Sequence, residues 1–302
     1  MAIIIQYALL VLEVRVKYAV YLPTFTPYAD ARVIASLAQE AEETGWDGFF
    51  IWDDVAGYEY SLADPWISLT AAAVATTRIR LGALITPLAR RRPWKVARET
   101  ATLDRLSGGR LVYGVGTGGG QEQFGDLGDE PDPKRRGDML DEGLEVLTGL
   151  WSGEPYEYEG QFYHIKKTRF LPAPLQTPRI PIWVGGRWPN TRPLGRMARW
   201  DGMFPLFPDH FSQEEELDRL RQTVADVQAL RGEDVHPFDV IVSGTTPLGR
   251  PEESAAITAK YARAGATWWL ESLAPQRGRE NGEDLWPFEK LRQKLREGPP
   301  QN

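Results

Sequence analysis

The sequence predicts an α/β fold: a single (β/α)8 TIM-type barrel with a long insertion between its fourth and fifth strands. Short, near-continuous apolar runs alternate with segments of helical spacing, which is typical of a parallel sheet covered by helices. The first four runs start roughly thirty residues apart, about the length of one βαβ unit. A doubly wound open sheet would need a glycine-rich turn after the first strand, and Leu22-Pro23-Thr24 stands there instead. We therefore expect the sheet to close into a barrel.

The predicted strands and helices follow one another along the whole chain. Eight ranges have the composition of a strand: 16–22, 48–52, 79–86, 111–116, 180–184, 202–206, 239–243 and 267–270. Apolar residues at helical spacing predict helices over 34–41, 65–76, 96–106, 139–151, 193–200, 217–230 and 286–296. In the long gap before the fifth strand, residues 156–163 alternate around Gly160, which predicts a hairpin or a covering loop.

One domain is predicted. Residues 16–297 form the barrel, residues 1–15 an N-terminal extension, and residues 298–302 a frayed tail. The apolar run at the start lacks the positive charge and cleavage site of a signal peptide, and it is too short to span a bilayer. It is either an extension before the domain or a segment docked on the barrel base or on a neighbouring subunit. We expect a cytoplasmic protein.

Composition excludes several classes of function. The net charge of -7, without long acidic runs, argues against nucleic acid or an anionic membrane as the main partner. The chain has no Cys, which excludes disulfides, thiol nucleophiles and thiolate metal sites. Its three His (His164, His210 and His236) are not at metal-ligand spacing, so no metal site is expected. His164 on the presumed hairpin is interpreted as structural.

The active site of such a barrel lies at the carboxyl ends of its strands. Here those ends combine aromatic residues, exposed glycines and few charges, which suits a planar cofactor better than a sugar or a metal. Gly185-Gly186-Arg187 leads toward a helix and is a candidate phosphate cradle, although the glycines could simply end the strand. An Asp at Gly186 is expected to block a phosphate and leave the fold intact. Gly116, Gly118, Gly119 and Gly120 would let the backbone approach a ligand, or form a flexible loop.

Few charged residues are candidates for chemistry. Asp53 and Asp54 are adjacent at the end of a strand, so their side chains should point to opposite faces, one as a base and the other as a cap. The run Arg90-Arg91-Arg92 could meet an acidic substrate or cofactor tail, although such runs are more often solvated. Glu271 ends the last strand, and with Asp54 it forms the only obvious carboxylate pair for a barrel hydrolase.

Several stretches occur in a specific order between Val16 and Leu273. They are residues 18–23 (YAVYLP), 45–53 (GWDGFFIWD), 79–87 (IRLGALITP), 103–110 (LDRLSGGR), 150–153 (LWSG), 160–163 (GQFY) and 181–186 (PIWVGG). This ordered set resembles the bacterial luciferase-like superfamily of flavin- and deazaflavin-dependent oxidoreductases.

The resemblance implies a barrel, usually a homodimer, that binds reduced FMN or the deazaflavin coenzyme at the carboxyl ends of its strands. By position, the family's non-proline cis peptide falls on Leu84-Ile85, beside Thr86, where the bulge would support one face of the isoalloxazine ring. The phosphate contacts fall on Gly185, Gly186 and Arg187. The stretch Gly116-Thr117-Gly118 resembles that of the deazaflavin-dependent sugar-phosphate dehydrogenases, and we count it among the cofactor-binding residues.

Two departures from the family pattern bear on the activity. Asp54 stands where luciferases and several deazaflavin enzymes have a catalytic His. Gly119 stands where the sugar-phosphate dehydrogenases have a Glu, and Glu122 follows three residues later. Both departures argue against light emission and sugar-phosphate oxidation. We expect Asp54 to transfer the proton, with Asp53 and Glu122 as the other candidates.

The resulting expectation is an oxidoreductase that uses reduced FMN, supplied by a separate flavin reductase, to oxygenate a small organic substrate. The first alternative is deazaflavin-dependent hydride transfer, and an alternative of another class is a non-catalytic flavin-binding protein. A homodimer is expected through the helices after the first three strands, because Ile67 to Ala75 is apolar on more faces than a surface helix needs.

Overall fold

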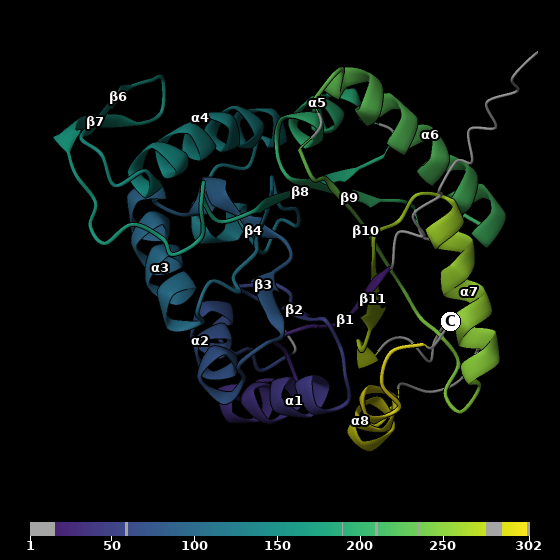
Figure 1. Ribbon diagram of the computed structural model, residues 1–302. Helices are drawn as coiled ribbons and strands as arrows, with labels where there is room; N and C mark the ends of the chain where they lie inside the picture. Colours follow the sequence, from purple (N-terminus) through teal and green to yellow (C-terminus); the bar gives the residue numbers. More distant parts are fainter. Residues whose placement is uncertain are drawn as a thin grey trace, which may run out of the picture.

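The computed structural model describes residues 16–57, 60–188, 190–208, 211–234, 236–275 and 286–300. The predicted extension at residues 1–15 lies outside the described residues. Figure 1 shows the strands grouped in the middle of a ring of helices. No helix among the described residues has the length and apolar character that crossing a membrane requires.

Nine parallel strands form the central sheet. In sheet order they are β3 (Arg80–Ala83), β2 (Gly48–Ile51), β1 (Lys17–Leu22), β11 (Trp268–Ser272), β10 (Asp239–Gly244), β9 (Gly202–Leu206), β8 (Ile182–Arg187), β5 (Tyr113–Gly116) and β4 (Thr86–Pro87). A parallel bridge from Leu81 on β3 to Leu111, two residues before β5, closes this order on itself beside β4, which pairs with β5. β3 and β4 are therefore two parts of one barrel strand, interrupted at residues 84 and 85, and the predicted (β/α)8 barrel is confirmed.

Helices cover the outside of the barrel. Within the described residues they are α1 (Ala31–Glu43), α2 (Pro65–Ala75), α3 (Pro93–Leu106), α4 (Pro133–Trp151), α5 (Thr191–Arg199), α6 (Gln213–Arg231), α7 (Pro251–Arg263) and α8 (Phe288–Arg296), with short 3-10 turns η1 (Leu88–Arg90) and η2 (Gly125–Leu127). Several begin at a side chain that accepts a free backbone amide of the first turn. Asp30 accepts from Arg32, Asp64 accepts from Ile67, and Ser212 and Glu215 form a capping box.

The sheet separates two hydrophobic cores. The outer core, between sheet and helices, includes Val20, Phe49 and Val184, and the inner core, inside the barrel, includes Ala19, Phe50 and Trp183. Successive residues of a strand thus alternate between the helix side and the barrel interior, as the pleat requires. This alternation extends to the ends of the strands and decides which side chains can reach a ligand.

The long insertion contains the predicted hairpin, β6 (Tyr156–Glu159) and β7 (His164–Thr168), which pair antiparallel. It lies outside the ring of helices beside α4 (Figure 1). The Glu142 carboxylate on α4 accepts hydrogen bonds from the amides of Gln161 and Phe162, at 2.8 and 2.9 Å. The turn of the hairpin is therefore fixed to α4 and does not enter the barrel.

The predicted frayed tail is wrong for its first residues. Gly298 and Pro300 are buried, and the Gly298 amide donates to the Leu295 carbonyl at 3.1 Å. A Cβ atom on Gly298 would lie 2.8 Å from the Thr44 carbonyl oxygen, so this glycine permits close packing of the chain end against α1. Residues 301–302 lie outside the described residues.

Candidate active site at the barrel mouth

The carboxyl ends of the barrel strands and the loops that follow them form what we call the mouth. The inner core shows which residues face it. Phe50 on β2 and Trp183 on β8 belong to the inner core, so Trp52, Gly185 and Arg187 continue the inner face of their strands, and Asp54, beyond the end of β2, lies near Tyr21, whose pKa its carboxylate raises. The residues between them, Asp53 and Gly186, continue the outer face.

Asp53 is held in buried ion pairs on the outer face. Its side chain has no solvent exposure, and its Oδ1 lies 2.6 Å from Arg90 Nη2 and 2.8 Å from Arg91 Nη2. Arg90 also donates to the Asp53 carbonyl at 2.5 Å. These contacts fix the Asp53 carboxylate behind the barrel wall, so we assign it a structural role and not proton transfer.

The interpretation of Arg90 and Arg91 as solvated surface residues is wrong. Their side chains are 5% and 20% exposed, and both are paired with Asp53. Burial by itself lowers the pKa of Arg91, but the neighbouring Asp53 carboxylate outweighs this effect, and the pKa of Arg91 is raised. Neither guanidinium is therefore available to an acidic substrate or cofactor tail without breaking a buried ion pair.

Asp54 lies in a different environment. Burial raises the pKa of Asp54 above the usual range of an aspartate, the Arg90 guanidinium opposes this rise, and the carboxylates of Asp53 and Glu122 add to it. Glu122, another predicted candidate, is thus near enough to repel the Asp54 charge. A carboxyl group with a raised pKa at the end of a barrel strand is suited to accept and release protons.

Leu84 and Ile85, predicted to contact the cofactor, are joined by a cis peptide bond. The Tyr21 hydroxyl donates to the Leu84 carbonyl at 2.6 Å. Burial raises the pKa of Tyr21, and the Asp54 carboxylate raises it further, so Tyr21 remains protonated and able to donate. Tyr21 therefore connects the break between β3 and β4 with the environment of Asp54.

Gly116 and Gly185 make room for Ile85. A Cβ atom on Gly185 would lie 1.9 Å from Ile85 Cδ1, and one on Gly116 would lie 3.2 Å from Ile85 Cγ2. The Ile85 side chain packs against the inner core between these two glycines. These two predicted cofactor residues thus surround the Ile85 side chain. Thr86, next along the chain, is paired in register with Val115 of the outer core, and its buried hydroxyl has no partner among the described residues.

The glycine-rich loop after β5 has a defined shape. The Thr117 carbonyl accepts from Arg136 Nε at 3.0 Å. Gly118 has a φ of +65°, and a Cβ atom there would lie 2.7 Å from the ring of the buried Phe124. Gly119 differs, because no atom lies within 4 Å of the position of its Cβ. The loop is therefore held in place by the contacts of Thr117 and Gly118, and Gly119 has free space around the position of its Cβ atom.

Gly186 and Arg187 have different surroundings at the end of β8. A Cβ atom on Gly186 would lie 2.4 Å from Pro193 Cβ on α5, so Gly186 permits the packing of this helix. The expectation that an Asp at Gly186 leaves the fold intact is therefore wrong. Arg187 is exposed on the inner face, beside Leu206 in the register of β9. Within the predicted phosphate cradle, Arg187 is thus the charged residue on the inner face.

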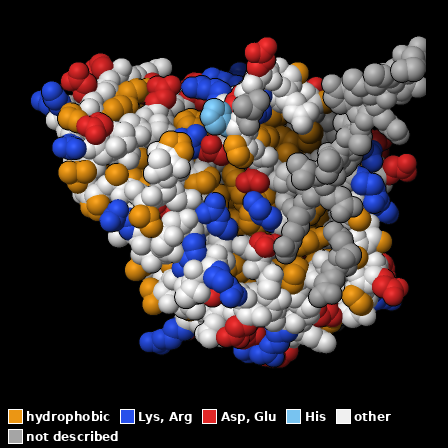
Figure 2. Space-filling model, in the orientation of Figure 1, with side chains coloured by type: hydrophobic (Ala, Val, Ile, Leu, Met, Phe, Trp, Pro, Cys, Tyr) orange, Lys and Arg blue, Asp and Glu red, His pale blue; other side chains and the backbone are white. Residues whose placement is uncertain are grey.

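Aromatic side chains that the sequence analysis did not identify line one side of the mouth. The rings of Phe25 and Tyr60 stack with centroids 4.9 Å apart, and Phe25 and Tyr21 each lie 5.8 Å from Trp52. Tyr21 also contacts Phe204 edge to face at 6.0 Å. The signal in the sequence was an aromatic residue on the inner face at two neighbouring strand ends, Tyr21 and Trp52. In Figure 2 hydrophobic side chains gather in the middle of the face shown, with charged side chains beside them.

The mouth fits a flavin or deazaflavin in three respects. The aromatic row offers flat apolar surface for a ring system, and the buried indole nitrogen of Trp52 has no partner among the described residues. Gly119 leaves backbone open to a ligand, and Arg187 supplies a positive charge for a phosphate. The cofactor would therefore place its ring near Trp52 and Ile85 and its phosphate toward Arg187.

The carboxylate pair of a barrel hydrolase is not formed. Glu271 lies on the outer face of β11, next to the inner Leu270. It is fully buried and accepts hydrogen bonds from the Thr246 amide and hydroxyl, both at 2.9 Å, and from the Trp269 indole at 3.0 Å. Glu271 is therefore engaged on the outer face and not available as the partner of Asp54, and we discard the hydrolase.

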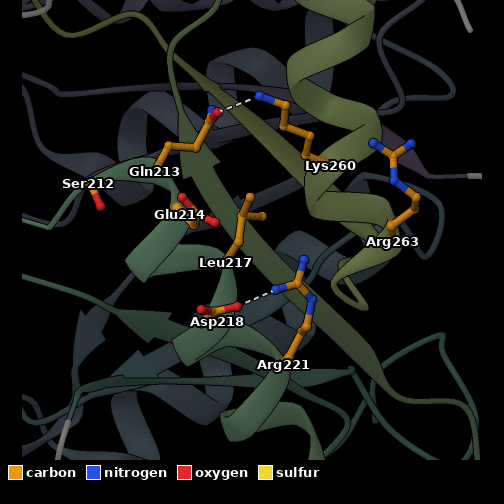
Figure 3. Close-up of a pocket in the computed structure, with 8 residues that line it drawn as sticks. All are labelled: Ser212, Gln213, Glu214, Leu217, Asp218, Arg221, Lys260 and Arg263. Atoms are coloured by element: carbon orange, nitrogen blue, oxygen red, sulfur yellow. Dashed lines mark hydrogen bonds and ion pairs between the residues drawn. The ribbon is translucent and has the colours of Figure 1, made fainter.

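A groove of about 600 Å³ lies elsewhere, between α6 and α7 (Figure 3). It is lined by Ser212, Gln213, Glu214, Leu217, Asp218, Arg221, Lys260 and Arg263. Lys260 donates to Gln213 at 2.9 Å, and Arg221 pairs with Asp218 at 2.5 Å. No residue of a strand end takes part, so the groove is not the active site of a barrel of this kind.

Potential metal ligands do not gather in the described part of the chain. It contains no group of three or more His, Asp or Glu side chains that could hold a metal ion. His164 is exposed on β7, outside the ring of helices, and pairs with Glu159 at 2.9 Å.

Comparisons with known proteins agree with this fold. A monooxygenase, RslO1 from Streptomyces bottropensis, has a similar structure, with a TM-score of 0.75 at 22% identity over 93% of this chain and 96% of that one. An uncharacterised protein of Mycobacterium tuberculosis is 35% identical over 249 residues, which is 76% of this chain and 80% of the relative. The F420-dependent glucose-6-phosphate dehydrogenase of Nakamurella multipartita is 34% identical over 173 residues, 55% of this chain and 50% of the enzyme.

Residues 16–298 match the family described as luciferase-like monooxygenase. This match spans nearly all of the described structure, and it begins at the first residue of the predicted barrel. The chain therefore belongs to the luciferase-like monooxygenase family and is an oxidoreductase that depends on a flavin or on the deazaflavin F420.

Proposed function

We propose that the protein is a monooxygenase that uses reduced FMN to oxygenate a small organic substrate at the barrel mouth. The observation that carries the proposal is the position of Asp54, a carboxyl group of raised pKa just beyond the end of β2, near Tyr21 of the aromatic row and Glu122. This combines a proton-transfer group with a surface for a flat ring in the place where such barrels bind their ligands.

The choice of FMN rests on the cations of the mouth. A deazaflavin with a long acidic tail needs several accessible positive charges, and Arg90 and Arg91 are both engaged by Asp53. Arg187 remains exposed, which is sufficient for a single phosphate. FMN carries one phosphate and no acidic tail, so the single exposed guanidinium of Arg187 is sufficient to bind its charge.

F420-dependent hydride transfer is the second candidate. It is favoured by the similarity to the F420-dependent glucose-6-phosphate dehydrogenase of Nakamurella multipartita, although the chain spans only about half of that enzyme. Gly119 in place of the Glu expected in sugar-phosphate dehydrogenases argues for a different substrate in this case.

Each residue of the site has a role in the proposal. Bound reduced flavin would supply the electrons for oxygen activation, and the protein orients and shields it. Tyr21 and Trp52 hold the ring from one side, and Arg187 neutralises the phosphate. Asp54 takes a proton from the substrate or returns one to the product, with its proton affinity raised by burial and by Glu122.

We further propose a cytoplasmic homodimer that receives reduced flavin from a separate reductase. The support for a dimer is α2, where Ile67 and Val74 are 65% and 71% exposed, seven residues apart and so on one face of the helix. Replacing both with Glu should convert a dimer to a monomer in sedimentation experiments. A wild-type monomer at micromolar concentration contradicts this part of the proposal.

The test is titration of the purified protein with FMN and with F420, followed by visible absorbance and fluorescence. We expect FMN to bind more tightly, and reduced FMN with oxygen to support substrate turnover. Tighter binding of F420 together with oxygen-independent turnover selects the second candidate. Binding of neither cofactor contradicts both.

A further inference from the structure

Gln123 joins two loops of the mouth that are far apart in the sequence. It follows the glycine-rich loop after β5 and is 8% exposed. Its Oε1 accepts from the Val55 amide at 3.0 Å, and its Nε2 donates to the Ala56 carbonyl at 2.5 Å. Val55 follows Asp54 directly, so Gln123 holds the backbone just after the proposed proton-transfer group.

A third loop meets at the same point. Arg90, in the turn that follows β4, donates to Gln123 Oε1 at 3.1 Å and to the Asp53 carbonyl at 2.5 Å. One amide side chain and one guanidinium thus tie together the segment that carries Asp54, the turn after β4 and the segment that follows the glycine run. These segments border the proposed proton-transfer group Asp54 and the predicted cofactor residues Gly116, Thr117 and Gly118.

Gln121 provides a contrast on the same loop. It is exposed, and the hydrogen bond of its side chain goes to Asp126 at 3.3 Å, within its own loop. The two glutamines are two residues apart and have the same chemistry. Only Gln123 bridges to the loop after β2.

We propose that Gln123 is a positioning residue that fixes the Asp54 carboxylate relative to the cofactor by holding Val55 and Ala56 against the glycine-rich loop. The inference rests on the proposed function, since it assigns Gln123 a role at the same site. Gln123 itself does not exchange protons. It acts through the backbone that carries Asp54, and through Arg90, whose charge opposes the rise of the Asp54 pKa.

Hydrogen exchange of the full-length, cofactor-free protein tests the tether directly. The Val55 amide donates to Gln123, so its protection from exchange should depend on that side chain. We expect Gln123→Ala to speed exchange in the peptide containing Val55 about tenfold or more, and Gln121→Ala to leave it unchanged. Gln123→Glu keeps the acceptor oxygen for Val55 and Arg90 but loses the donor to the Ala56 carbonyl, so it should retain only part of the protection. Unchanged exchange in Gln123→Ala overturns the tether.

The effect on the cofactor is read from the visible spectrum of bound oxidised FMN, or of F420 if that is the cofactor that binds. Gln123→Ala should shift this spectrum in the same direction as Asp54→Asn, whereas Gln121→Ala should leave it unchanged. Lost protection with an unchanged spectrum overturns the positioning role and leaves a purely structural tether. If wild-type protein binds neither cofactor, the proposed function fails, and the exchange measurement still decides whether the tether exists.

Discussion

Asp53 and Asp54 are adjacent in the chain and differ in almost every physical respect. Asp53 points outward, is fully buried and is paired with two guanidinium groups, whereas Asp54 lies near Tyr21 and has a raised pKa. The same contrast recurs on β8, where Gly186 packs under α5 and Arg187 is exposed on the inner face. At these strand ends the outer residue maintains the helix layer and the inner residue is available to a ligand. Two adjacent residues at a strand end can therefore have different roles, one in the stability of the fold and the other in ligand binding or catalysis.

The largest expected effect is the loss of stability when Asp53, just beyond the end of β2, is replaced. Asp53→Asn keeps the shape of the side chain and leaves Arg90 and Arg91 without a carboxylate, which should lower the free energy of unfolding by about 3–5 kcal/mol. Urea unfolding at pH 7 measures this loss. The control is Asp138→Asn, which breaks the exposed pair with Arg192 and should cost at most about 1 kcal/mol. Equal effects of the two substitutions contradict the assigned role of Asp53.

The outer position of β8 should be nearly as sensitive. Gly186→Asp forces a side chain into Pro193 and buries a charge against α5, so we expect a loss of at least about 3 kcal/mol of stability. Gly119→Asp is the matched control, because its Cβ meets no atom within 4 Å. A thermal melt compares the two variants. A Gly186→Asp protein as stable as Gly119→Asp would show that Gly186 does not support the helix.

The inner position of β2 should affect turnover more than stability. Asp54→Asn cannot accept a proton at neutral pH, so turnover should fall about 10²-fold or more, equivalent to roughly 2.7 kcal/mol in the activation free energy. Cofactor affinity should change by less than about threefold. The measurement is kcat beside the dissociation constant of the cofactor. Wild-type turnover in this variant would leave Asp54 as a turn residue.

Replacement of Arg187, the inner residue at the end of β8, should have the smallest free-energy effect of the four substitutions. Arg187→Ala removes one charge-assisted contact to the cofactor phosphate, which we expect to weaken binding about tenfold, or about 1.4 kcal/mol. Arg192→Ala on α5 is the control, since Arg192 is paired with Asp138. Titration with the cofactor compares the dissociation constants of the two variants. If both variants bind like wild type, the phosphate lies elsewhere, and the loop around Gly119 becomes the first candidate.

The sequence sufficed for the barrel and for the alternation of Asp53 and Asp54, because both follow from local periodicity. It also placed the break between β3 and β4, through the resemblance of the stretch around Leu84 and Ile85. The preference for Asp54 over Asp53 came from the resemblance, and the ion pairs of Asp53 with Arg90 and Arg91 support it.

Contacts between distant segments could not be predicted. The burial of Arg90 depends on a carboxylate 37 residues away, and Gln123 bonds to an amide 68 residues away. Gly186 was misjudged because a glycine pair at a strand end indicates close approach and does not reveal whether a ligand or a helix approaches. The approaching residue is Pro193, which lies on the following helix.

The contrast between the two aspartates is tested most directly by the free energy of unfolding of Asp53→Asn and Asp54→Asn, measured against wild type from pH 4 to pH 7. The folded-state pKa of Asp54 is raised, so the neutral carboxyl is favoured by folding, and this contribution is lost as the pH rises through that pKa. Asp54→Asn should therefore match wild type at low pH and become the more stable protein toward pH 7, whereas Asp53→Asn should be less stable than wild type at pH 7. Destabilisation of both variants at pH 7 would contradict the account.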